Sequence, residues 1–189
     1  MKRIKFLIIM VFSGLINISS SQDFGYFELE SLNRIESNNG FSPQVNIYSN
    51  YMRENSSIGF YFFALANKNW GEAYGGITLQ AAKWLKINLG LGLETNPGPY
   101  RFNITFFAYH KRMSLLQIYE YGGSGFWYRI RANYNINTHH NIGLLAERYY
   151  GIGPVYEYKL KFPLGFLGAP LMDPEDGTFK MLTSLRYYF

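Results

Sequence analysis

The sequence predicts an all-β fold: an antiparallel, up-and-down transmembrane β-barrel of twelve strands, with ten strands as the alternative. Three observations support this prediction. An export signal opens the chain, extended segments of about ten residues follow at short intervals, and the last segment ends on an aromatic residue. Most segments alternate polar and apolar residues, which is typical of strands because successive side chains point to opposite faces.

The N-terminus has the three parts of a secretory signal peptide. Residues 1–5 are cationic, residues 6–16 are nearly all apolar, and residues 17–21 are small and polar. The apolar run is shorter than the roughly 20 residues that a spanning helix needs. We therefore expect a signal peptide over 1–21 and one barrel domain over 22–189.

Composition excludes several classes of function. The chain has no cysteine, which excludes a lipoprotein anchor, disulfides and cysteine-based catalysis or metal binding. Its 18 basic and 13 acidic residues give a net charge of +5, but three of the basic residues belong to the signal peptide. The mature chain is then close to neutral and lacks the clustered cationic footprint of a nucleic-acid-binding protein, so no nucleic-acid partner is expected.

The fifth and eighth segments show the alternation most clearly. In the fifth, Leu85, Leu89 and Leu93 oppose Lys86 and Asn88, a pattern that a helix would scatter around its cylinder. The third segment is apolar on both faces, so its orientation cannot be determined. The expected strands cover about 24–35, 42–53, 58–67, 72–81, 85–94, 101–106, 113–121, 125–135, 141–150, 154–161, 164–171 and 179–189.

An even strand number places both termini on one side of the membrane, the periplasmic side in bacterial barrels. The periplasmic connections would then carry most of the lysines and histidines, and the outer ones the glycines and prolines. The outer connections are 37–40, 68–71, 95–99, 122–125, 151–153 and 172–177, and the periplasmic ones are 54–57, 81–84, 110–112, 136–140 and 161–163.

The last strand resembles that of bacterial outer-membrane β-barrel proteins, and the whole mature chain resembles the small members of this class in Gram-negative bacteria. Leu185, Tyr187 and Phe189 match the apolar and aromatic positions with which these proteins end. The resemblance implies that these residues form a C-terminal signal for the barrel assembly machinery. It also implies export to the bacterial outer membrane, with outer-membrane lipid as a partner.

Alternation alone is also compatible with a soluble barrel, in which apolar side chains point inward. The signal peptide, the aromatic C-terminus and aromatic residues near segment ends favour the membrane interpretation, because such residues form girdles at the two interfaces. The expected outer girdle contains Tyr48, Trp70, Tyr100, Tyr121, Phe126 and Tyr150, and the inner one Trp84, Tyr134, Tyr187 and Phe189.

In a membrane barrel the polar faces line a charged lumen. Opposite charges there could pair and plug the interior, or they could line a narrow, porin-like channel for small anionic solutes. The predicted lumen residues are Lys86, Arg101, Arg129, Arg131, Lys159, Lys161, Lys180 and Arg186, together with Glu28, Glu30, Glu72, Glu94, Glu147 and Glu157.

Two further functions remain as alternatives. Short outer connections argue against a receptor, but a plugged barrel could dock another outer-membrane protein. A lipid-modifying enzyme is the third hypothesis, although His110, His139 and His140 all fall in periplasmic connections. Ser114 follows His110 closely, but it is better explained as a polar residue at the start of a strand. The two adjacent histidines lack a third ligand for a metal. The sequence therefore predicts no catalytic residues, metal site or cofactor.

Overall fold

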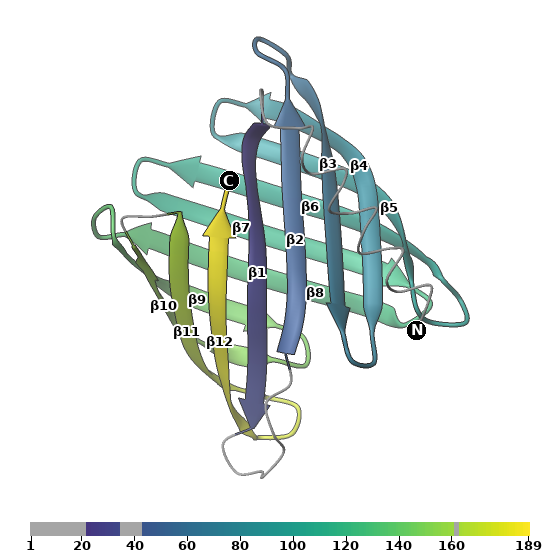
Figure 1. Ribbon diagram of the computed structural model, residues 1–189, viewed down its shortest axis with the longest axis vertical. Coiled ribbons are helices and arrows are strands. Elements are labelled where there is room, and N and C mark those ends of the chain that lie inside the picture. Colours follow the sequence, from purple (N-terminus) through teal and green to yellow (C-terminus); the bar gives the residue numbers. More distant parts are fainter. Residues whose placement is uncertain (1–21, 35–42, 161–162) are drawn as a thin grey trace.

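The computed structural model describes residues 22–34, 43–160 and 163–189, and it forms a closed barrel of twelve antiparallel strands in chain order (Figure 1). The predicted twelve-stranded fold is confirmed. The strands are β1 (Gln22–Arg34), β2 (Pro43–Met52), β3 (Ile58–Asn67), β4 (Gly71–Ala82), β5 (Leu85–Glu94), β6 (Tyr100–His110), β7 (Met113–Gly122), β8 (Gly125–Asn135), β9 (His140–Glu147), β10 (Gly151–Lys159), β11 (Leu164–Met172) and β12 (Phe179–Tyr188).

Some predicted features lie outside the described residues: the signal peptide over 1–21, the connection at 37–40 and the lumen residue Lys161. Within the described part of the chain, no helix is long and apolar enough to cross a membrane.

The connection between β9 and β10 lies earlier in the chain than the sequence suggests. We expected strands over 141–150 and 154–161, whereas β9 ends at Glu147 and β10 begins at Gly151. Tyr149 and Gly151 adopt φ values of 69° and 118°, which break the extended conformation and turn the chain back. Arg148 therefore lies in the turn and does not interrupt the apolar face of a strand.

The first and last strands close the barrel. β1 and β12 pair over nine residue positions, with Leu29 opposite Leu185. The final residue extends this seam, because Phe189 and Gly25 exchange two backbone hydrogen bonds of 3.0 Å each. The last residue of the chain thus takes part in closure itself.

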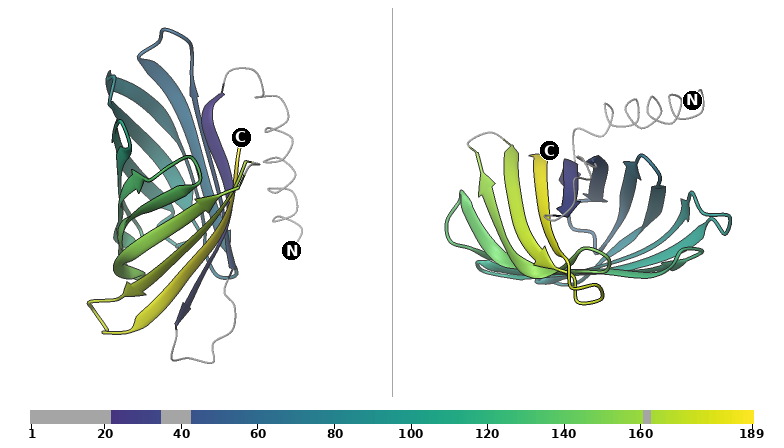
Figure 2. Two further views of the ribbon diagram at one scale, coloured as in Figure 1. Left: turned by 90° about the vertical axis from the view of Figure 1, so that its left-hand side faces the viewer. Right: turned by 90° about the horizontal axis from the view of Figure 1, so that it is seen from below.

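The barrel is flattened, and its two walls cross. In Figure 1 the near wall of β11, β12, β1 and β2 runs steeply across the far wall of β6 to β8, and Figure 2 shows the same walls from the side and from below. Side chains from opposite walls can therefore meet in the interior, and the contacts described below show that they do.

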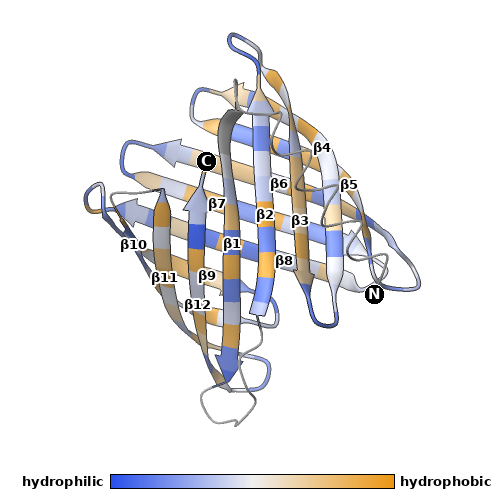
Figure 3. Ribbon diagram, in the orientation of Figure 1, coloured by the Kyte–Doolittle hydropathy of each residue, from blue (hydrophilic) through white to orange (hydrophobic). Residues whose placement is uncertain are grey.

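The outer face is apolar and the inner face polar, so hydropathy alternates along most strands (Figure 3). On β5, Leu91 is 73% exposed while Asn88 is 5% exposed. A soluble barrel has the opposite arrangement. The structure therefore supports the membrane interpretation, in which the exposed leucines and aromatic rings face lipid.

The exposed fractions of the side chains also show which face of β3 points into the barrel, a point that the sequence leaves undetermined. Phe60 and Phe62 face outward and Tyr61 is buried inside the barrel. Two predicted girdle residues are placed differently, because Tyr48 accepts a 3.2 Å hydrogen bond from Asn88 in the interior and Tyr150 packs against buried interior leucines. The prediction that these two tyrosines lie in the outer girdle is wrong.

Candidate functional site

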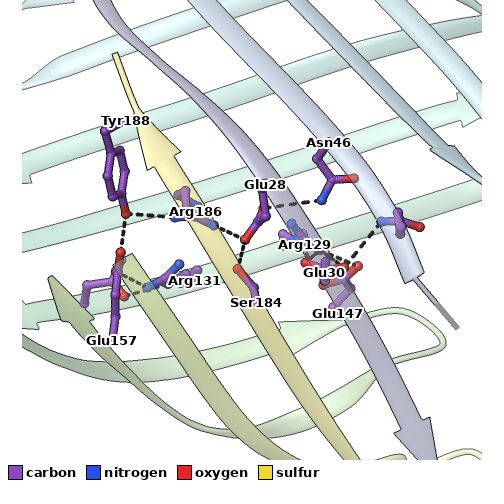
Figure 4. A network of polar contacts seen from close by, with 12 residues as sticks. Glu28, Glu30, Asn46, Arg129, Arg131, Glu147, Glu157, Ser184, Arg186 and Tyr188 are labelled. Carbon is purple, nitrogen blue, oxygen red and sulfur yellow. Dashed lines mark hydrogen bonds and ion pairs between the residues drawn. The ribbon is translucent and has the colours of Figure 1, made fainter. Parts of the chain in front are cut away.

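Polar side chains fill the lumen in two networks. The first joins the near and far walls and contains Glu28, Glu30, Arg129, Arg131, Glu147, Glu157, Ser184, Arg186 and Tyr188 (Figure 4). The second lies on β4 to β7 and the turn that follows β7, and it contains Glu72, Tyr74, Glu94, Arg101, Asn103, Glu120 and Ser124.

Arg129 joins opposite walls of the barrel. Its Nε lies 2.6 Å from Glu147 on the neighbouring strand β9, and its Nη2 lies 3.3 Å from Glu30 on β1. β1 and β8 are not neighbours, since β12, β11, β10 and β9 separate them on the shorter way round. The guanidinium of Arg129 therefore crosses the lumen, and we call its contact with Glu30 the latch (Figure 4).

The rest of the first network pairs every remaining carboxylate. Arg186 lies 2.7 Å from Glu28, and Ser184 donates a hydrogen bond to the same carboxylate. Glu157 lies 2.9 Å from Arg131 and also accepts a hydrogen bond from Tyr188. Such pairing is needed in a dry interior, because an unpaired buried charge is costly.

A glycine makes one of these contacts possible. Tyr188 on β12 and Glu157 on β10 meet across β11, where Gly165 occupies the inward position between them. A Cβ atom there would lie 3.2 Å from the Glu157 carboxylate and 3.3 Å from the Tyr188 ring. The absence of a side chain at Gly165 leaves room for the contact.

Arg101 is the centre of the second network. Its guanidinium lies 2.5 Å from Glu94, 3.1 Å from Glu120 and 3.8 Å from Glu72, and all four side chains are at most 8% exposed. Tyr74 donates a 2.9 Å hydrogen bond to Glu120 and accepts one of 2.5 Å from Arg101. One arginine thus contacts three buried acidic side chains, so acidic groups outnumber basic ones in this network.

Tyrosine rings lie flat against glycines on β4 and β5. Tyr61 reaches over Gly76 and Gly90 to donate a 2.9 Å hydrogen bond to Asn103 on β6, and Tyr74 lies over Gly92 in the same way. A Cβ atom at Gly90 would overlap the Tyr61 hydroxyl. The inward glycines of β5 therefore provide the space that these rings occupy.

Gly90→Ala is expected to lower the free energy of unfolding by about 1–3 kcal/mol, the usual cost of overpacking, because Tyr61 must leave Asn103. Urea unfolding of the detergent-folded protein, followed by tryptophan fluorescence, measures this change. Gly75→Ala is the matched control, since a Cβ atom at Gly75 on the outer face of β4 meets nothing within 4 Å. Equal losses in the two variants would contradict the packing role of Gly90.

Part of the lumen is apolar, which the sequence does not predict. Six buried residues on β9 to β12 form this apolar cluster: Leu145, Val155, Leu167, Ala169, Leu171 and Leu182. Beside it, Lys180 donates hydrogen bonds of 2.5 Å to Asp173 and 2.7 Å to the carbonyl of Tyr149. The bond from Lys180 lowers the pKa of the Asp173 carboxyl, which lies in the connection after β11.

The predicted lumen residues fall into three groups. Eleven of the fourteen, counting Glu94, take part in the contacts above, and Lys161 lies outside the described residues; the others of the eleven are Glu28, Glu30, Arg101, Arg129, Arg131, Glu147, Glu157, Lys180, Arg186 and, by a longer contact, Glu72. Glu94 joins them through Arg101. Lys86 and Lys159 occupy inward positions of β5 and β10, and the Lys159 ammonium lies 5.4 Å from the Tyr188 ring.

Sequence reasoning missed Glu120, because the mixed pattern of the seventh segment concealed its inward face. A signal for it exists in the register, since Glu120 lies directly opposite Asn103, a predicted inward residue of the sixth segment. With Glu120 included, the two networks hold four arginines and seven glutamates. Their overall balance is therefore acidic rather than basic.

His139 and His140 make ordinary structural contacts. His140 Nδ1 lies 2.7 Å from the Tyr156 hydroxyl, and His139 Nδ1 lies 2.8 Å from the Lys159 carbonyl. Ser114 accepts a 3.4 Å hydrogen bond from Asn133. Among the described residues, no three metal-ligating side chains cluster as a metal site would require.

A closed antiparallel barrel with a charged interior and an apolar exterior has the architecture of the outer-membrane β-barrel proteins. The barrel fold that the resemblance in the sequence implies is confirmed by structural similarity to porins. A KdgM porin is 12% identical with a TM-score of 0.55, over 87% of this chain and 99% of that one. A NanC porin is 9% identical with a TM-score of 0.55, over 86% and 98%.

A second KdgM porin structure, in complex with disordered oligogalacturonate, is 14% identical with a TM-score of 0.54, over 88% of this chain and 99% of that one. At these identities the similarity shows a shared fold. No family model matches the sequence, and no curated protein matches it.

Proposed function

We propose that the protein is an exported barrel of the bacterial outer membrane whose lumen is a narrow passage for small anionic solutes, held closed by the latch. The observation that carries this proposal is the position of Arg129, which bridges Glu30 on one wall and Glu147 on the other. The Arg129 guanidinium lies across the lumen at this point, and its release from Glu30 would free the side chain to move aside.

Two observations support anionic solutes. The first network brings Arg129, Arg131 and Arg186 together on the walls that a solute would pass. A porin of the same fold is described in complex with oligogalacturonate, an acidic saccharide. The acidic balance of both networks opposes this preference, so selectivity for anions depends on arginines that the passage exposes once the latch opens.

Glu30→Gln is expected to open the passage, because it removes the charge that holds Arg129 across the lumen and leaves the pair with Glu147 intact. In planar bilayers, the wild-type protein should be closed for most of the time. The variant should give frequent conductance steps, with an anion-selective reversal potential in a KCl gradient.

Glu147→Gln is the matched control, because it removes the contact between neighbouring strands and keeps the latch. Frequent openings in both variants would show that lost charge, rather than the latch, controls conductance. A cation-selective reversal potential would contradict the proposed solute class but not the proposed passage.

A second candidate function is a closed accessory barrel that docks another outer-membrane protein. The apolar cluster favours it, because leucines that fill the lumen between β9 and β12 leave no polar path along that side. Silence of both the wild type and Glu30→Gln, in a barrel shown to be inserted, would support this function over a passage.

A further inference from the structure

A hollow of about 930 Å³ lies on the outer face of the barrel and crosses β6 to β11. Its lining is almost entirely apolar, and its volume is within the range of small-molecule sites. It is distinct from the lumen, because lining residues such as Leu115, Tyr134 and Leu144 are exposed on the outer face of their strands.

The strand register explains why the wall is hollowed there. Ala132 lies opposite Leu115 on β7 and Leu144 on β9, and Leu144 lies opposite Pro154 on β10. Small or compact residues thus alternate with leucines across the wall, and Gly168 on β11 extends the depression. The result is a shallow apolar trough with space for a flexible hydrocarbon chain.

One end of the trough is basic. His110 lines the trough, and Lys111 and Arg112 follow it as exposed residues of the turn between β6 and β7. Arg112 also donates a 3.3 Å hydrogen bond to the carbonyl of Ile136 in the next connection. The described connections at 83–84, 111–112 and 136–139 contain no acidic residue, so the positive charge is uncompensated along this rim.

We propose that this trough is a binding site for one anionic phospholipid, with an acyl chain along Ala132 and its phosphate beside Lys111 and Arg112. Apolar burial supplies affinity for the chain, and basic residues at a membrane surface attract anionic head groups. The basic rim lies at the end of the barrel where β1 begins and β12 ends, which corresponds to the periplasmic side in bacterial barrels. The site rests on the proposed insertion of the barrel in a membrane.

Native mass spectrometry of the detergent-folded protein tests the site after incubation with phosphatidylglycerol or phosphatidylcholine. The wild type should retain one phosphatidylglycerol per chain and release phosphatidylcholine. Ala132→Trp should reduce retention about tenfold, which corresponds to lost burial of roughly two methylene groups. Lys111→Gln with Arg112→Gln should abolish the preference by lowering the retention of phosphatidylglycerol to that of phosphatidylcholine.

Each trough variant has a control that carries the same kind of substitution on another part of the barrel. Ala73→Trp adds the same ring to an alanine on the opposite part of the barrel, and Arg53→Gln with Lys68→Gln removes two exposed charges elsewhere. Both controls should bind phosphatidylglycerol as the wild type does. The heat-modifiable migration of each variant in gels reports whether its barrel has folded and is read independently of lipid retention.

Equal retention of the two lipids by the wild type would overturn the proposal. Equal effects of Ala132→Trp and Ala73→Trp would also overturn it, as would a dimer without bound lipid, which would assign the trough to a second copy of the chain. A folded barrel that inserts in vesicles but retains no lipid refutes this site alone, whereas failure to insert refutes the proposed function.

Discussion

Replacing Arg101 by glutamine is expected to lower the free energy of unfolding by about 3–5 kcal/mol, the usual cost of removing one partner from a buried ion pair. The effect is large because Glu72, Glu94 and Glu120 would lose their shared cation in a site where each side chain is at most 8% exposed. Chemical unfolding of the detergent-folded protein, with tryptophan fluorescence as the signal, measures the loss.

Arg34→Gln is the matched control, because Arg34 pairs with Asp176 at 3.3 Å while their side chains are 55% and 38% exposed. Surface pairs of this kind contribute about 0–1 kcal/mol. In addition, Glu94→Gln combined with Arg101→Gln should recover part of the stability, since it removes one of the carboxylates that lost its cation. If the Arg34 and Arg101 variants lost similar amounts of unfolding free energy, Arg101 would not be the partner of a buried acidic cluster.

Leu89→Arg is expected to cost about 2–4 kcal/mol, the range for an arginine that faces lipid near the bilayer midplane. Leu89 lies in the middle of β5, opposite Ile77 on β4 and Ile104 on β6 on the outer face. The difference in folding free energy between the variant and the wild type, measured in lipid vesicles, tests the value.

Leu93→Arg provides the comparison within the same strand. Leu93 also faces outward but lies near the end of β5, where an arginine reaches the interface and costs about 0–1 kcal/mol. A membrane barrel should therefore distinguish the two positions by depth. A barrel with water on its outer face would tolerate both substitutions about equally.

The sequence predicts the positions of the strands with good accuracy, because alternation with period two depends only on which side of a strand each residue faces. The fifth and eighth strands agree with the prediction at both ends. Their leucines, isoleucines and arginines leave no ambiguity about the faces. The turn before Gly151 was misplaced because its left-handed residues include Tyr149, which gives no turn signal in the sequence.

The partners inside the lumen could not be predicted in the same way. Alternation assigns Arg129 to the interior but does not indicate whether it meets Glu147 or Glu30, since the second contact depends on how far the barrel is flattened. Asn88 illustrates the same limit. Its place on the polar face suggests tolerance of an added charge, whereas Asn88 is buried between Thr78 and Tyr48, and arginine would break both hydrogen bonds.

The apolar cluster was missed for a related reason. Leu145, Leu167 and Leu182 occupy inward positions, but a polar lumen was expected throughout. In the eleventh segment, inward Leu167 and Leu171 alternate with outward Phe166 and Pro170, so neither face is polar and the hydropathy pattern does not separate them. Only the closed structure shows which of these residues share the interior.

The flat tyrosines over the β4 and β5 glycines also make the bore of this barrel adjustable by engineering. Truncating Tyr61 and Tyr74 would uncover Gly76, Gly90 and Gly92, whose bare backbone already forms the wall beneath the rings. Both truncations would also remove hydrogen bonds, those of Tyr61 with Asn103 and of Tyr74 with Glu120 and Arg101. Smaller residues at positions 61 and 74 would therefore enlarge the free volume inside this part of the barrel and lower its stability.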